Sequence, residues 1–95
     1  MATKSTKYNK SGISKLPDNK PVVYKIQSDS GNNNYTGIAK RGRVQERLTE
    51  HLPGGKDYIP GSTVHIEQMD SISDARAKES RIISRSKPKY NKQGK

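Results

Sequence analysis

The sequence contains no cysteine, phenylalanine or tryptophan, and only fifteen of its 95 residues are leucine, isoleucine or valine. Without cysteine the chain can form neither disulfides nor thiolate metal sites. No apolar run approaches the length of a membrane span, and the first residues lack the hydrophobic stretch of a signal peptide. We therefore expect a soluble, cytoplasmic protein without membrane contact, built as one small domain around a limited core.

The apolar residues and the net charge occupy different parts of the chain. Thirteen of the fifteen aliphatic residues lie between Val22 and Ile83, where nine lysines and arginines are almost balanced by eight acidic residues. The net charge of +10 therefore comes mainly from the two ends. This pattern predicts a basic disordered arm over residues 1–20 and a folded domain over residues 21–95. Basic ends favour binding to the phosphate backbone of a nucleic acid, although they could also serve only solubility.

Periodicity within that domain predicts an α+β fold. Residues 22–28 and 35–39 have the composition of strands, and the turn-forming residues 29–34 between them predict a β-hairpin. Apolar residues at every fourth position predict a helix over about residues 43–52. Alternation over residues 62–69 predicts a third strand, and a capping pattern at Ser71 predicts a second helix to about residue 86. The expected structure is a small three-stranded sheet flanked by helices.

Glu79 is the most informative single residue, because it falls on the apolar side of the second predicted helix. That side also carries Ala75 and Ile82, so an apolar residue is expected at position 79. A carboxylate that faces a core must be paired, protonated or bound to a metal. The alternatives are a salt bridge to Arg76 or Arg81, or a position at the edge of the apolar stripe.

Arg47 and His51 lie one turn apart on the first predicted helix, beside its buried side. Arginine offers a planar fork of donors that suits phosphate oxygens, and histidine can move a proton near neutral pH. The pair is therefore a candidate for chemistry on a phosphate. The alternative is an ordinary helix-end pair that interacts with Glu46 or Glu50.

Tyr24 and Tyr35 lie on neighbouring strands of the predicted hairpin. Cross-strand aromatic pairs are common packing contacts. Their hydroxyls could instead orient or deprotonate an attacking water molecule.

Basic residues outside these elements are candidates for binding a nucleic-acid backbone. Lys40, Arg41 and Arg43 precede the first predicted helix and could grip phosphates at its N-terminus, or form only a solvated cluster. Lys87 and Lys89 belong to the basic C-terminal segment and are assigned the same role.

The order of these residues resembles that of the GIY-YIG nuclease family over about residues 22–91. The two motifs of the family, Gly-Ile-Tyr and Tyr-Ile-Gly, correspond to Val22-Val23-Tyr24 and Tyr35-Thr36-Gly37, and the first lacks its glycine here. The family also has a helical arginine and histidine, a metal-binding glutamate and a C-terminal asparagine. These match Arg47, His51, Glu79 and Asn91.

The resemblance implies the GIY-YIG fold and a divalent-metal-dependent endonuclease that hydrolyses phosphodiester bonds, with DNA favoured over RNA. Glu79 would hold one Mg²⁺ or Mn²⁺ per site. Arg47 would neutralise charge in the transition state, and Asn91 would orient local hydrogen bonds.

The same resemblance implies that Tyr24, assisted by His51, is the general base toward water and that Tyr35 positions that water. A phenol with an ordinary pKa of about 10 is a poor base at neutral pH. The scheme therefore requires the metal, Arg47 or His51 to lower the pKa of Tyr24.

Two further questions stay open on the sequence. The main alternative function is a small, basic, non-catalytic nucleic-acid-binding protein. If the chain is a nuclease, it could be a phage or mobile-element enzyme, or the tip of a secreted toxin that is delivered into a target cell.

Because no second recognition domain is visible, sequence specificity would require a homodimer or a specificity partner. A toxin would be expected to have an immunity partner.

Overall fold

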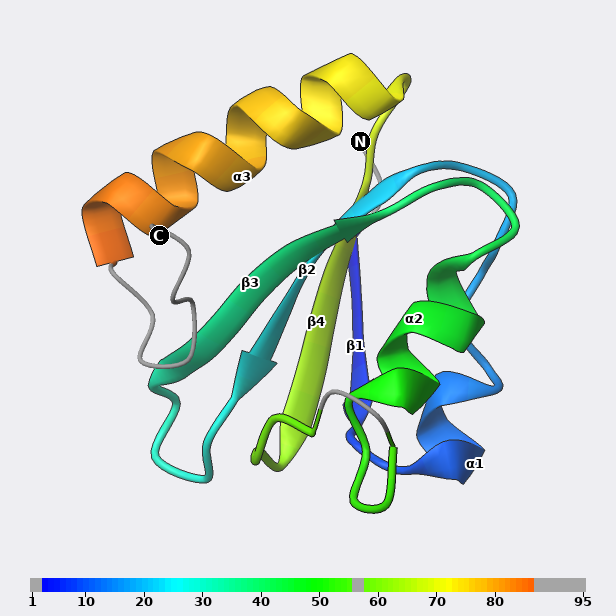
Figure 1. Cartoon of the computed structure of the whole chain (residues 1–95), viewed down its shortest axis with the longest axis vertical. Helices are drawn as coiled ribbons and strands as arrows, with labels where there is room; N and C mark the ends of the chain where they lie inside the picture. The colour runs from blue at the N-terminus through cyan, green and yellow to red at the C-terminus, as the bar shows by residue number, and fades with distance from the viewer. Residues whose placement is uncertain (1–2, 56–57, 87–95) are drawn as a thin grey trace.

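The computed structural model describes residues 3–55 and 58–86, which form an α+β fold (Figure 1). A four-stranded sheet has the order β1-β4-β2-β3, and every neighbouring pair is antiparallel. The α+β class is confirmed, whereas the sheet has one strand more than predicted. Along the chain the elements are β1 (Thr3–Lys7), α1 (Lys10–Ile13), β2 (Val22–Gln27), β3 (Asn33–Ala39), α2 (Val44–Glu50), β4 (Thr63–Gln68) and α3 (Ile72–Ser86).

Strands β2 and β3 form the predicted hairpin. The loop between them is closed by the Ser28 amide, which donates to the Asn32 carbonyl at 2.9 Å. Gly31 has a φ of 88° in this loop, a conformation that glycine adopts without steric cost. The register places Tyr24 opposite Gly37 and Ile26 opposite Tyr35. The hairpin therefore brings both tyrosines onto one face of the sheet.

The two faces of the sheet carry separate cores. Side chains alternate along a strand, so Tyr24 and Ile26 point to one face and Val23 to the other. The first core includes Val44 and Leu48 of α2 and residues of the N-terminal segment. The second core lies under α3, which packs along β3 and β2. Helices α2 and α3 therefore cover opposite faces of the sheet (Figure 1).

The N-terminal segment corrects the prediction of a disordered arm over residues 1–20. Strand β1 pairs with β4 along its whole length, and Ile13 and Leu16 are only 1% and 2% exposed. Tyr8 is also buried, and its hydroxyl contacts the Ile59 carbonyl at 2.7 Å. The spacing of these three side chains along the sequence matches neither a helix nor a strand, because each belongs to a different local structure. They are buried because they dock on a core that the rest of the chain provides.

The helices begin and end close to their predicted limits. Helix α2 is shorter than predicted at both ends, and His51 is its C-terminal cap. The capping interaction at Ser71 is confirmed, because its hydroxyl accepts a hydrogen bond from the Asp74 amide at 3.1 Å. Within residues 3–55 and 58–86, no helix has both the length and the apolar character needed to cross a membrane.

Candidate functional site

Tyr24 and His51 form a buried hydrogen-bonded pair between the sheet and the end of α2. The Tyr24 hydroxyl and His51 Nε2 lie 2.8 Å apart, and both residues are 0% exposed. Tyr24 is held by the centre of β2, whereas His51 is held at the C-terminus of α2. A hydrogen bond of this length between a phenol and an imidazole permits proton transfer between them. Only the resemblance to the nuclease family had suggested that these two residues act together.

Tyr35 completes an aromatic group around this pair. Its ring centroid lies 4.9 Å from that of His51 and 6.1 Å from that of Tyr24, with tilted planes. Tyr35 is partly exposed, unlike the other two. The two tyrosines therefore pack across the strands and also share a polar site with His51. Of the two, Tyr35 is the one that a ligand can reach from solvent.

Arg47 lies beside the phenol of Tyr24 and is also partly exposed. Its Nη1 pairs with Glu50 Oε1 at 2.8 Å, so the helix-end ion pair considered from the sequence is present. That ion pair does not turn Arg47 away from the aromatic group, because the charge of the guanidinium still lowers the pKa of Tyr24. Glu50 thus holds the guanidinium near the hydroxyls of Tyr24 and Tyr35.

Burial raises the pKa of the Tyr24 phenol far above its ordinary value, and the neighbouring Tyr35 adds to this rise. The positive charge of Arg47 acts in the opposite direction but does not offset the burial. The implied scheme required a lowered pKa, and the structure gives the reverse. Tyr24 is therefore a neutral phenol in the free protein, so it cannot accept a proton without giving up its own.

Glu79 lies on α3, the helix on the other face of the sheet, and is partly exposed rather than buried. It stands at the edge of the apolar stripe, which was one of the alternatives considered from the sequence. Partial burial raises the pKa of its carboxyl group, and nearby Arg76 opposes that rise. The charge of Glu79 also raises the pKa of Tyr24, so the carboxylate acts on the aromatic group across the edge strand β3.

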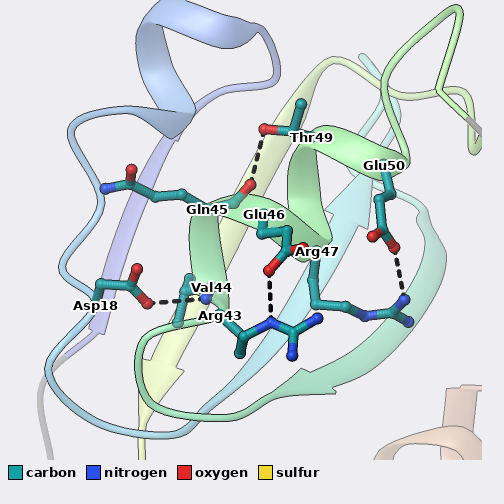
Figure 2. Close-up of polar contacts among 8 residues, drawn as sticks. All are labelled: Asp18, Arg43, Val44, Gln45, Glu46, Arg47, Thr49 and Glu50. Atoms are coloured by element: carbon teal, nitrogen blue, oxygen red, sulfur yellow. Dashed lines mark hydrogen bonds and ion pairs between the residues drawn. The ribbon is translucent and has the colours of Figure 1, made fainter.

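The first amide of α2, beside the basic residues that precede the helix, already has a carboxylate partner. Figure 2 shows the Asp18 side chain at this position, where its Oδ1 accepts from the Val44 amide at 2.8 Å. A carboxylate therefore already occupies one amide at this helix N-terminus, and phosphate binding by the basic residues before α2 stays a prediction. Lys40, Arg41 and Arg43 are exposed, and Arg43 pairs with Glu46.

Three predicted residues lie outside the described part of the chain. These are Lys87, Lys89 and Asn91. Their roles in binding and in orienting hydrogen bonds stay predictions.

Tyr8 is a positioning residue that the sequence did not reveal. Its hydroxyl donates to the carbonyl oxygen of His51, which also accepts from the Ile59 amide at 2.9 Å. The backbone of His51 is thus fixed from the N-terminal segment as well as from the loop before β4. The only signal in the sequence is that Tyr8 is the single aromatic residue in an otherwise polar stretch.

In the described ranges no group of three or more histidines, cysteines, aspartates or glutamates is arranged to hold a metal ion. The predicted site rests on one carboxylate, Glu79, and Mg²⁺ commonly keeps several water ligands beside one or two carboxylates.

A scan against models of known protein families gives no match to this chain, and a search of curated proteins gives none either.

Proposed function

We propose that the chain is a divalent-metal-dependent endonuclease of the GIY-YIG type that hydrolyses phosphodiester bonds, with DNA as its main substrate. The observation that carries this proposal is the hydrogen bond of 2.8 Å between Tyr24 and His51, with Arg47 and Tyr35 against it. These four residues come from three separate elements of the fold. A fully buried phenol–imidazole pair beside a partly exposed arginine is suited to combined proton transfer and phosphate binding.

Proton transfer in this site uses His51 as the final acceptor. The raised pKa of Tyr24 makes a free phenolate unfavourable, so the phenol does not act as an independent base. Instead the Tyr24 hydroxyl donates its proton to His51 Nε2 as the phenol oxygen takes a proton from the attacking water. The hydrogen bond between the two groups lets both transfers occur in one step, and no phenolate accumulates.

Substrate meets the site through Arg47 and Tyr35, because these are the members that solvent reaches. Arg47 binds the phosphate and opposes the negative charge that develops in the transition state. A phosphate on this guanidinium would lie near Tyr24, since the charge of Arg47 acts on the phenol and lowers its pKa. Tyr35 packs on the His51 ring and presents its edge to the attacking water.

Glu79 is the residue that would hold the metal. Its carboxyl group is partly desolvated, which raises its pKa, and the nearby Arg76 opposes this rise without cancelling it. A hard oxygen ligand in this state fits Mg²⁺ or Mn²⁺, which would stabilise the charged carboxylate. When bound, such an ion polarises a phosphate oxygen and stabilises the leaving oxygen.

The test is cleavage of plasmid DNA and of RNA by the purified chain, with Mg²⁺, with Mn²⁺ and with EDTA. We expect cleavage of DNA only with a divalent cation, and its loss in Glu79→Ala with an unchanged circular dichroism spectrum. Glu46→Ala is the matched control, because this glutamate is exposed on α2 and pairs only with Arg43 among the interactions seen. Full activity in EDTA or in Glu79→Ala would overturn the proposal.

A non-catalytic nucleic-acid-binding protein is the second candidate. The observation in its favour is that Tyr24 and His51 are inaccessible in the free protein, as core residues would be. This function predicts DNA binding at low salt without cleavage under any metal condition. The same assay, combined with a gel-shift measurement, separates the two functions.

A further inference from the structure

A basic pocket opens beside the proposed active site, between the end of β3, α2 and the start of α3. It has a volume of about 250 Å³, and four of its lining residues are cationic. They are Lys40, Arg43, Arg47 and Arg76. Arg47 belongs both to this pocket and to the site with Tyr24, so the two are continuous.

Two of the four cations are paired with glutamates of α2. Arg43 and Arg47 each pair with a glutamate on α2, as drawn in Figure 2. Lys40 forms no ion pair with a residue in the described ranges, and Arg76 lies close enough to Glu79 to lower the pKa of its carboxyl group. Lys40 and Arg76 are both exposed and line the same small space from different parts of the fold. An anion that enters this space would be attracted by both charges.

The floor of the pocket is apolar. Ile38 of β3 and Ile72 of α3 line it, and both pack against the second core. A water molecule takes up roughly 30 Å³, so a phosphate group alone, about the size of a few waters, would fill only part of the space. The combination of several cations with an apolar floor matches a sugar joined to a phosphate better than an inorganic anion.

We propose that this pocket binds the sugar-phosphate of the nucleotide next to the cleaved bond, with Arg76 and Lys40 as its phosphate-binding residues. The proposal rests on the endonuclease function, since Arg47 links the pocket to the cleaved phosphate. Arg76 lies one turn before Glu79 and lowers the pKa of that carboxyl. One face of α3 therefore presents a phosphate-binding residue and the metal-binding residue to consecutive phosphates of the same strand.

Binding of a short fluorescein-labelled DNA duplex, measured by fluorescence anisotropy without divalent metal, tests the pocket separately from cleavage. All variants are made in the Glu79→Ala protein, so that loss of Arg76 cannot act through Glu79. We expect Arg76→Ala to weaken binding about tenfold at low salt, the loss expected for one charged hydrogen bond. The magnitude of the slope of log affinity against log salt concentration should fall by about 0.9, which corresponds to the loss of one phosphate contact. Arg76→Lys should keep the slope.

Arg81→Ala is the matched control, since Arg81 is exposed on α3 five residues further on and does not line the pocket. It should change affinity less than Arg76→Ala. An equal loss in the two variants, or no loss in Arg76→Ala, would overturn the pocket as a binding site. These outcomes leave the endonuclease function standing if the wild-type protein cleaves DNA. Conversely, if Arg76→Ala weakens DNA binding as expected but the wild-type protein never cleaves DNA, the pocket is supported as a binding site and the endonuclease function is rejected.

Discussion

Tyr24 and Gly37 face each other across the hairpin, and the ring of Tyr24 lies where a side chain on residue 37 would be. A Cβ atom added at position 37 would stand 2.6 Å from the Tyr24 hydroxyl oxygen and 3.0 Å from Cε2 of Tyr35. Gly37 has no φ in the left-handed region, so space and not backbone conformation demands glycine here. The glycine of the second motif thus allows the phenol of Tyr24 to cross β3 toward Arg47.

Gly37→Ala should therefore displace the Tyr24 ring and separate its hydroxyl from His51. We expect a loss of about 1–3 kcal/mol in the free energy of unfolding, typical of overpacking, together with loss of cleavage. Urea denaturation and a plasmid nicking assay measure the two effects. Gly31→Asn is the control, because position 31 has open space and asparagine tolerates its positive φ. It should leave cleavage unchanged.

Tyr24→Phe should reduce turnover more than Tyr35→Phe. The phenylalanine keeps the ring but removes the hydroxyl that contacts His51 Nε2, which ends the proposed proton relay. Loss of a general acid–base group typically lowers the rate by about 10²–10⁴-fold. Single-turnover cleavage at saturating protein measures this rate. If Tyr24→Phe cleaved DNA normally, Tyr24 would be a packing residue.

Arg47→Ala should lower turnover far more than DNA affinity, because the proposed role of its guanidinium is to oppose charge in the transition state. A loss on the order of 10²-fold or more is expected for such a donor. Arg41→Ala is the comparison, since Arg41 is exposed and lies outside the pocket. It should change affinity slightly and turnover very little. Separate measurements of kcat and KM distinguish the two effects, and normal turnover in Arg47→Ala would remove Arg47 from the reaction.

The N-terminal segment should be required for folding and not only for DNA binding. Leu16 is 2% exposed in the first core, so Leu16→Ala should cost about 2–5 kcal/mol. Lys15→Ala, at the neighbouring exposed position, should cost little. Thermal denaturation of both variants gives the comparison. A Leu16→Ala protein as stable as wild type would restore the interpretation of residues 1–20 as an arm.

Glu79→Gln should be slightly more stable than wild type at neutral pH in EDTA. Burial raises the pKa of Glu79 in the folded state above its value in the unfolded chain. Ionised Glu79 therefore costs folding free energy at neutral pH, and the cost disappears below about pH 4, where both states are protonated. Urea denaturation at several pH values measures the difference between the two proteins. The expectation fails if wild type is the more stable protein at neutral pH.

The sequence by itself determined the local elements and the residue types of the site. The hairpin, both predicted helices and the strand at residues 63–68 follow from periodicity and turn residues, which act over a few positions along the chain. The choice of Tyr24, Tyr35, Arg47 and His51 came from their chemistry and order. Their convergence is explained by the alternation of the hairpin and by the one-turn spacing on α2.

Only the tertiary structure decided how these groups behave. The burial that raises the pKa of Tyr24, and the partial exposure of Glu79, depend on how the sheet and helices pack, which no short segment specifies. The docking of Tyr8 and Leu16, and the Asp18 carboxylate at the start of α2, join residues far apart in the chain. Such contacts arise from the shape of an assembled core, so the N-terminal segment looked disordered when read alone.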